Sequence, residues 1–350
     1  MIILDLQKFI FMLKPKNSIT FLILLSTILS TYYCDAQQVV NKDEFTPHGE
    51  PIVRFFSNFH TDLSNEINES AFEITRSYLG YKYFINEYFS TEVKIDIGNL
   101  ENIFSGSETR RYTYFKNVAL KYNKDKFTWY FGIIPTKLFK LQEKYWGHRY
   151  LYKTLPDEHE MGSSADAGTS FDYRFNSNIS ADISIMNGEG YEKPQLDNTF
   201  RTGIGITVRL SEHFTTRLYY DFIAKEEIQS IFAGFLGWKD ERLTFGIEVD
   251  FMVNSNYILN QNQTGYSTYA SYLLSKKFEI FGRFDKLASN KPEGMENDWN
   301  VTNDGQAIIG GIQFMPVNEV KIALNFRNWY STAVDIGNQP FLFLSFEFNL

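Results

Sequence analysis

Cysteine is almost missing from this sequence, and so are long apolar runs. The 350 residues contain one cysteine, Cys34, so neither a disulfide framework nor a thiolate metal site is expected. After residue 36 no stretch reaches the roughly 18 uncharged apolar residues that a membrane-spanning helix needs. The formal net charge is -8, and an acidic chain argues against a nucleic-acid partner.

Motifs for catalysis and metal binding are also missing. The five histidines are scattered, and neither an HExxH nor a GxSxG motif occurs. Gly203-Ile204-Gly205 is followed by no helical pattern and predicts no phosphate cradle. The run Asp157-Glu158-His159-Glu160 is more typical of a hydrated loop than of a metal site. We therefore expect no enzyme, no metal and no cofactor.

Aromatic residues are what the sequence has in excess. Phe, Tyr and Trp together make up 17% of the chain. Aromatic and β-branched residues favour strands, and aromatic side chains also collect where a membrane meets water. The composition therefore indicates a β protein with a membrane boundary.

The N-terminus has the pattern of an export signal. Lys8, Lys14 and Lys16 precede a short apolar run over 19–29, and Ala36 is a suitable residue for cleavage. We predict a cleaved signal peptide over 1–36; its removal would reduce the 34 basic and 42 acidic residues by three and two, to 31 and 40. The alternative, a retained membrane anchor, is disfavoured because the run is short. Lipidation at Cys34 is rejected because Tyr32 and Tyr33 before it are bulky.

Runs with apolar and polar residues in alternation follow the leader to the end of the chain. In Phe214–Phe222, for example, Leu218 and Tyr220 lie on one face, and Arg217 and Asp221 lie on the other. Most prolines fall between such runs, as expected for central strands. Sixteen strands are predicted, at 51–60, 71–83, 88–97, 112–122, 127–134, 166–175, 179–187, 199–210, 214–223, 228–238, 243–252, 265–274, 278–286, 305–315, 319–327 and 341–350.

The connections between these runs alternate between long and short, with one exception at 224–227. Short turns at one rim and long loops at the other are typical of an outer-membrane barrel. We predict a closed antiparallel transmembrane β-barrel of about 16 strands over 51–350, after a short periplasmic segment at 37–50. A soluble all-β protein would also alternate, but no repeat of about 40–50 residues indicates a propeller.

Charged residues on the polar strand faces define the expected lumen. Basic and acidic residues occur there in nearly equal numbers. These charges are expected in a water-filled interior, because a Lys or Arg facing lipid at mid-depth costs about 2–4 kcal/mol. Structural pairing along the wall is a more common role for such charges than contact with a solute, and Arg283 and Asp285 could pair with Arg217 and Asp221. The residues predicted to line the lumen are Arg201, Arg209, Arg217, Asp221, Arg283, Asp285, Lys321 and Arg327.

The longest connection, 135–165, is the candidate for a pore constriction. Leucines and aromatic residues interleave with basic residues there, which predicts a short amphipathic helix with its apolar side on the barrel wall. A solvated surface loop is the alternative. If the segment folds inward, a ring of basic residues at a narrow point favours anions. The constriction residues predicted on this basis are Lys137, Lys140, Lys144 and Arg149.

Three segments resemble a known family. Glu279–Lys286, Gly132–Thr136 and the aromatic C-terminal strand are similar to the phosphate-selective porin family and to related porins of Bacteroidetes-type bacteria. The resemblance implies a sixteen-stranded porin that forms a homotrimer, with a loop folded inward to narrow the pore.

The expected function is passive diffusion of small hydrophilic solutes or ions across the outer membrane of a Gram-negative bacterium, with a mild preference for anions such as phosphate. The expected partners are outer-membrane lipid and those solutes. A receptor or adhesin barrel with a closed lumen is the alternative, and it would use the loops at 98–111 and 287–304. An outer-membrane enzyme ranks third.

Overall fold

The computed structural model describes residues 45–64, 70–99, 111–334 and 336–350. The chain divides into two units, Met1–Phe45 and Thr46–Leu350, and all the strands and helices named here belong to the second. The expected signal peptide at 1–36 lies outside the described residues.

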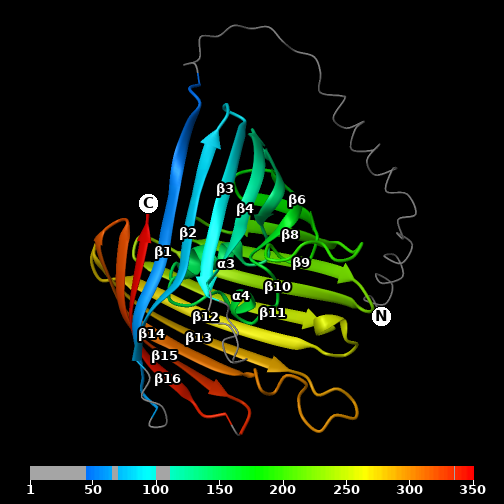
Figure 1. The fold of residues 1–350 in the computed structure, drawn as a ribbon, viewed down its shortest axis with the longest axis vertical. Helices are drawn as coiled ribbons and strands as arrows, with labels where there is room; N and C mark the ends of the chain where they lie inside the picture. Colours follow the sequence, from blue (N-terminus) through cyan, green and yellow to red (C-terminus); the bar gives the residue numbers. More distant parts are fainter. Residues whose placement is uncertain (1–44, 65–69, 100–110, 335) are drawn as a thin grey trace. The chain divides into compact units, whose positions relative to one another are not determined.

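Sixteen strands form one closed antiparallel barrel, in which each strand pairs with its neighbours in sequence and β1 pairs with β16 (Figure 1). The strands are β1 His48–Asp62, β2 Ser70–Phe84, β3 Phe89–Asn99, β4 Arg111–Lys124, β5 Phe127–Pro135, β6 Ala165–Arg174, β7 Ile179–Met186, β8 Arg201–Arg209, β9 Phe214–Ala224, β10 Ile228–Lys239, β11 Leu243–Val253, β12 Gln263–Leu273, β13 Phe278–Ser289, β14 Gly305–Val317, β15 Val320–Ser331 and β16 Gln339–Asn349.

The fold class predicted from the alternation is confirmed, and each expected strand is present with shifted ends. The strand β1 begins at His48 rather than at residue 51, because its pairing with β2 continues to His48 opposite Phe84. The segment expected at 37–50 therefore ends earlier. Pro316 lies inside β14, where the pairing with β15 is irregular between Phe314 and Val317 and a missing N–H is tolerated.

The side-chain pattern of each strand follows from its two environments. In β9 the side chains of Arg217, Tyr219 and Asp221 are buried inside the barrel, while Leu218 and Tyr220 are exposed on its outer face. In β16 Leu344 is exposed, and Glu347 is buried. An outward apolar face and an inward polar face are what a barrel in lipid requires.

The two rims of the barrel differ in their connections. The short-turn rim has 85–88, 125–126, 175–178, 210–213, 240–242, 274–277 and 318–319. The long-loop rim has 63–69, 100–110, 136–164, 187–200, 225–227, 254–262, 290–304 and 332–338. The segment 136–164 carries two helices, α3 Lys140–Trp146 and α4 Leu155–Glu158, and 254–262 carries the short η2 Ser255–Tyr257.

None of the helices in the described part of the chain is long and apolar enough to cross a membrane.

The outward position of Leu344 gives a test of the barrel in lipid. Leu344→Arg places a charge on the outer face near the middle of β16, and we expect it to destabilise the folded barrel in bilayers by about 2–4 kcal/mol. Urea titrations in lipid vesicles, read by the folded band on an unboiled gel, measure the change. Leu274→Arg, at an exposed position on the short-turn rim, is the matched control. Equal destabilisation by both substitutions would contradict the assignment of the outer face.

Candidate functional site

The connection 136–164 lies against the inner wall of the barrel. Helix α3 contacts β10 and β11, and α4 contacts β12. Trp146 and Gln142 are the buried residues of α3, whereas Lys144 is exposed. The helix ends at Gly147, which adopts a left-handed conformation (φ 68°) and donates its N–H to the carbonyl of Glu143.

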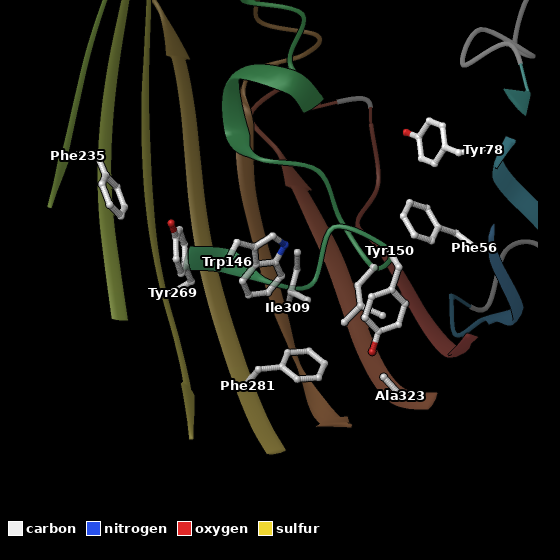
Figure 2. Close-up of a cluster of buried hydrophobic side chains, with 10 residues drawn as sticks. Phe56, Tyr78, Trp146, Tyr150, Phe235, Tyr269, Phe281, Ile309 and Ala323 are labelled. Atoms are coloured by element: carbon white, nitrogen blue, oxygen red, sulfur yellow. The ribbon is translucent and has the colours of Figure 1, made fainter. Parts of the chain in front are cut away.

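A cluster of buried, mainly aromatic side chains packs this segment against strands β10–β15 and against β1 and β2 (Figure 2). The Trp146 ring lies 5.5 Å from that of Tyr269 and 6.1 Å from that of Phe281. Further along the chain, the Tyr150 ring lies 6.4 Å from Phe56 of β1, and its hydroxyl donates to Gln313 of β14 at 2.7 Å. Burial of several aromatic rings contributes most of the stabilisation in such a contact.

Three basic residues of the wall donate hydrogen bonds to backbone carbonyls of the inserted segment. Arg217 donates to Lys137 (3.0 Å), Arg283 to Lys153 (2.7 Å) and Lys321 to Gly147 (3.2 Å). Because α3 and α4 are short, many of the segment's carbonyls have no partner within a helix. The three charged donors of the expected lumen set therefore position the segment.

Several residues of the expected lumen set form ion pairs along the wall. Arg201 bonds Asp221 at 2.7 Å, Arg283 bonds Asp285 of its own strand, and Arg217 bonds Asp182 of β7. The suggested pairing of Arg283 and Asp285 with Arg217 and Asp221 is wrong, because β9 and β13 are not neighbours in the barrel. Arg209 is exposed at the end of β8, and Arg327 lies 3.8 Å from the Phe343 ring centroid.

The four expected constriction residues have different environments. Lys137 forms an ion pair with Asp172 (2.7 Å), and Lys140 forms one with Glu143 (3.5 Å). Lys144 is exposed beside them. Together with Lys126 and Arg174, they line a cavity of about 390 Å³ at the short-turn end, which holds more basic than acidic side chains.

Arg149 differs from the three lysines because it crosses the lumen. Its side chain is 8% exposed; it bonds Asp157 at 3.0 Å and reaches Glu143 at 3.3 Å within the inserted segment. It also donates to the Tyr78 hydroxyl of β2 at 3.2 Å. Burial opposes the ionisation of Asp157, but Arg149 and Lys153 hold the pKa of this carboxyl below its usual value. Arg149 thus connects the inserted segment to β2 through a polar contact.

On the wall next to β2, two inward side chains of β3 are partly exposed. Glu92 and Lys94 of β3 retain 29% and 24% side-chain exposure. Towards the long-loop rim, a cavity of about 600 Å³ is lined by Arg76 and Asp96 on the wall and by Asp157 on the inserted segment. Polar side chains of β2 and β3 therefore remain accessible beside the inserted segment.

Three inward residues near Arg149 were not predicted from the sequence. Arg76 and Tyr78 of β2 face inward beside Arg149, and Lys116 of β4 is buried against Ser164 and Tyr191. Strict alternation from Lys121 assigns Lys116 to the outer face. The register shift between Lys94 and Ile95 is a bulge that turns Lys116 inward instead. The inward position of Arg76 could have been found from its spacing to Tyr78.

Acidic residues gather between α3 and the wall, but no metal site is formed. Glu248 and Asp250 occupy adjacent inward positions of β11, and none of their carboxylate oxygens has a hydrogen-bond partner among the described residues. Within the same residues, no group of three or more His, Cys, Asp and Glu is placed to hold a metal ion.

The architecture is that of known outer-membrane channels. The structure matches Salmonella typhi OmpF in complex with daunomycin (TM-score 0.64, 9% identity, 86% of this chain and 97% of that chain). The chain has the porin fold. It also matches the outer membrane channel DcaP of Acinetobacter baumannii (TM-score 0.60, 10% identity, 90% and 100% covered) and Pseudomonas putida OprB (TM-score 0.66, 7% identity, 86% and 94% covered). Neither a family model nor a curated protein matches the sequence.

The buried pair of Arg283 and Asp285 gives a test of how the inserted segment is held. Both side chains are 0% exposed, so Arg283→Met leaves Asp285 without its partner and removes the bond to Lys153. We expect a loss of about 3–5 kcal/mol in the free energy of unfolding. Urea unfolding in detergent measures it, and limited proteolysis tests whether 136–164 becomes accessible.

The double variant Arg283→Met/Asp285→Leu is the control for that prediction. Because it removes both charges, it should recover part of the lost stability while the segment remains accessible to protease. A double variant no more stable than Arg283→Met would show that the ion pair is not what holds this region.

Proposed function

We propose that this protein is an outer-membrane porin through which small hydrophilic solutes and ions diffuse passively. The observation that carries the proposal is that the inserted segment leaves polar cavities on both sides, about 600 Å³ towards the long loops and about 390 Å³ towards the short turns. The proposed route joins these cavities along β2–β5, where Glu92 and Lys94 are partly exposed. The porin fold and the apolar outer face of the strands support a location in the outer membrane of a Gram-negative bacterium.

The narrow point of this pore is the crossing of Arg149 towards Tyr78. Arg76 and Lys116 stand on the wall near it, and Asp96 and Asp157 lie among them. Charge acts most strongly on an ion where the passage is narrowest and least screened. Because both signs are present at this point, the preference between cations and anions depends on the regions on either side.

We further propose a mild preference for anions, phosphate among them. The support is the short-turn cavity, where Lys126, Lys140, Lys144 and Arg174 outnumber the acidic groups. The resemblance of Glu279–Lys286 to the phosphate-selective porin family is in line with this preference. A homotrimer is the proposed assembly, and a trimer form is recorded for the structurally similar OmpT of Vibrio cholerae.

A receptor or adhesin barrel with a closed lumen remains the second candidate, because the hydrogen bond between Arg149 and Tyr78 crosses the route. Conductance separates the two functions. Purified protein in planar bilayers should give stepwise ohmic currents if it is a diffusion pore. A barrel that inserts and folds but carries no current would overturn the proposed function.

Ion preference is tested by removing two exposed charges. Lys140→Gln/Lys144→Gln should lower the ratio of anion to cation permeability by roughly a factor of two, because it neutralises part of the basic short-turn cavity. Reversal potentials under a KCl gradient measure this ratio. Lys276→Gln/Lys277→Gln removes the same charge from an exposed short turn and should leave the ratio unchanged. A cation-selective wild type would refute the anion preference.

The crossing contact is tested separately by its effect on current. Tyr78→Phe removes only the hydroxyl that Arg149 reaches, and Arg149→Gln removes the charge as well. We expect the single-channel conductance to rise in both variants, by roughly twofold in Arg149→Gln, since the side chain that crosses the route is shortened and released. Arg209→Gln, at the exposed end of β8, serves as the control. Unchanged conductance in both variants would place the narrow point elsewhere.

A further inference from the structure

A second cavity lies on the other side of the inserted segment. It has a volume of about 730 Å³ and opens among the long-loop connections 254–262, 290–304 and 332–338. Its wall is formed by β14, β15 and β16, and the inserted segment contributes Tyr152 and His159. The volume lies within the range of small-molecule sites, about 300–1,000 Å³.

This cavity is closed towards the short-turn rim. Below it, the inward residues Gln313, Ala323 and Ser345 of the same three strands are 1%, 0% and 0% exposed. Tyr150 covers Gln313 through the 2.7 Å hydrogen bond of its hydroxyl. A solute that enters the cavity therefore has no continuation along this wall, and the cavity can hold a ligand rather than pass it.

The lining combines aromatic rings with amide side chains. The rings are those of Tyr152, Trp299, Trp329, Phe341 and Phe343, and the amides include Asn300, Asn303 and Gln339. Three lining residues carry a formal charge, Glu158, Glu160 and Arg327. The cavity of about 600 Å³ beside Arg76 contains many more, among them Arg76, Asp96, Lys153, Asp157, Arg201 and Asp221. The two cavities thus differ in the chemistry that they offer.

Contacts hold several of these groups in place. The Trp329 ring packs at a tilt of 41° against His159 with 5.2 Å between ring centroids. Burial lowers the pKa of His159 to about 4, so the imidazole is neutral at pH 7. Trp299 donates its Nε1–H to the carbonyl of Asn262 at 2.9 Å. Arg327 lies over Phe343 and donates its Nε–H to Asn325 at 2.7 Å. Rings and donors that are fixed before binding lose little conformational entropy on binding.

We propose that this cavity is a binding site for a neutral saccharide that arrives from the long-loop side. The C–H face of a pyranose ring is apolar and packs on an aromatic ring, as on Trp329 or Phe341. Its hydroxyl groups each need a donor and an acceptor, and a planar amide such as that of Asn303 or Gln339 provides both. A low local charge favours a neutral ligand over a solvated ion, which would lose its hydration without a matching counter-charge.

The site is tested by titrating the purified protein in detergent with neutral disaccharides (maltose, lactose and cellobiose). Trp299 and Trp329 make intrinsic fluorescence a direct reporter, and calorimetry provides a second readout. At least one disaccharide should bind saturably with a dissociation constant in the millimolar range or below. Sodium sulfate and glycine, titrated over the same range, should produce no saturable change. No saturable binding of any of the three disaccharides, or equal binding of sulfate or glycine, would overturn the proposal.

Variants on the two sides of the inserted segment locate the site. Asn303→Ala/Gln339→Ala changes two exposed amides and should weaken disaccharide binding at least tenfold by calorimetry, with an unchanged unfolding midpoint. Trp329→Phe keeps a ring at that position and should weaken binding less than Trp329→Ala. The control is Tyr114→Ala in the cavity of about 600 Å³ beside Arg76, which should leave the affinity unchanged. If Tyr114→Ala abolished binding and Asn303→Ala/Gln339→Ala did not, the saccharide would belong to the other cavity.

This site is independent of the proposed diffusion pore. Asn303→Ala/Gln339→Ala should leave the conductance as it is in the wild type, because the cavity lies off the route along β2–β5. Conductance without sugar binding would contradict the saccharide site alone, and sugar binding without conductance would contradict the proposed pore alone.

Discussion

Pairing of the first strand with the last is the constraint on which the rest of the structure depends. The ladder between β1 and β16 runs from Arg54 opposite Asn349 to Asp62 opposite Phe341, and it leaves the sheet without an edge. In lipid an unpaired backbone N–H or C=O costs several kcal/mol, so a sheet with an apolar outer face must close. Closure of sixteen strands creates an interior wider than side chains alone can fill. The inserted segment 136–164 is the part of the chain that partly fills it.

The interior is divided because the inserted segment uses different forces on its two sides. Against β9–β15 it is held by aromatic packing, which extends to Phe56 of β1, and by wall cations that bind its carbonyls. Against β2 it makes a polar contact through Arg149 and Tyr78. Apolar packing excludes water and closes that half, whereas charged groups keep water beside them. One inserted segment can therefore leave space for the proposed solute route beside β2 and a closed-ended cavity beside β14–β16.

The sequence predicts the barrel much better than the interior. Strand positions follow from alternation, a local pattern that each strand of about ten residues carries by itself, and the amphipathic spacing of α3 is equally local. The partners of the inserted segment are not local: Tyr150 meets Gln313, and Arg283 binds the carbonyl of Lys153. The bulge that turns Lys116 inward shifts the period by one residue and leaves no mark in the composition. The prediction of a basic constriction also did not include the pairing of Arg149 with Asp157 and Glu143.

The contact between Arg149 and Tyr78 has a consequence for the electrical behaviour of the proposed pore. When a voltage is applied across a membrane, most of the potential falls over the part of the water column with the highest resistance, which is the narrow point. Moving one elementary charge through 100 mV involves about 2.3 kcal/mol. That energy exceeds the strength of a typical hydrogen bond between protein groups, about 0.5–1.5 kcal/mol. The membrane potential therefore acts on the guanidinium of Arg149 and, in the opposite direction, on the carboxylates of Asp157 and Glu143 that pair with it, so these partners reduce the net force on its bond to Tyr78.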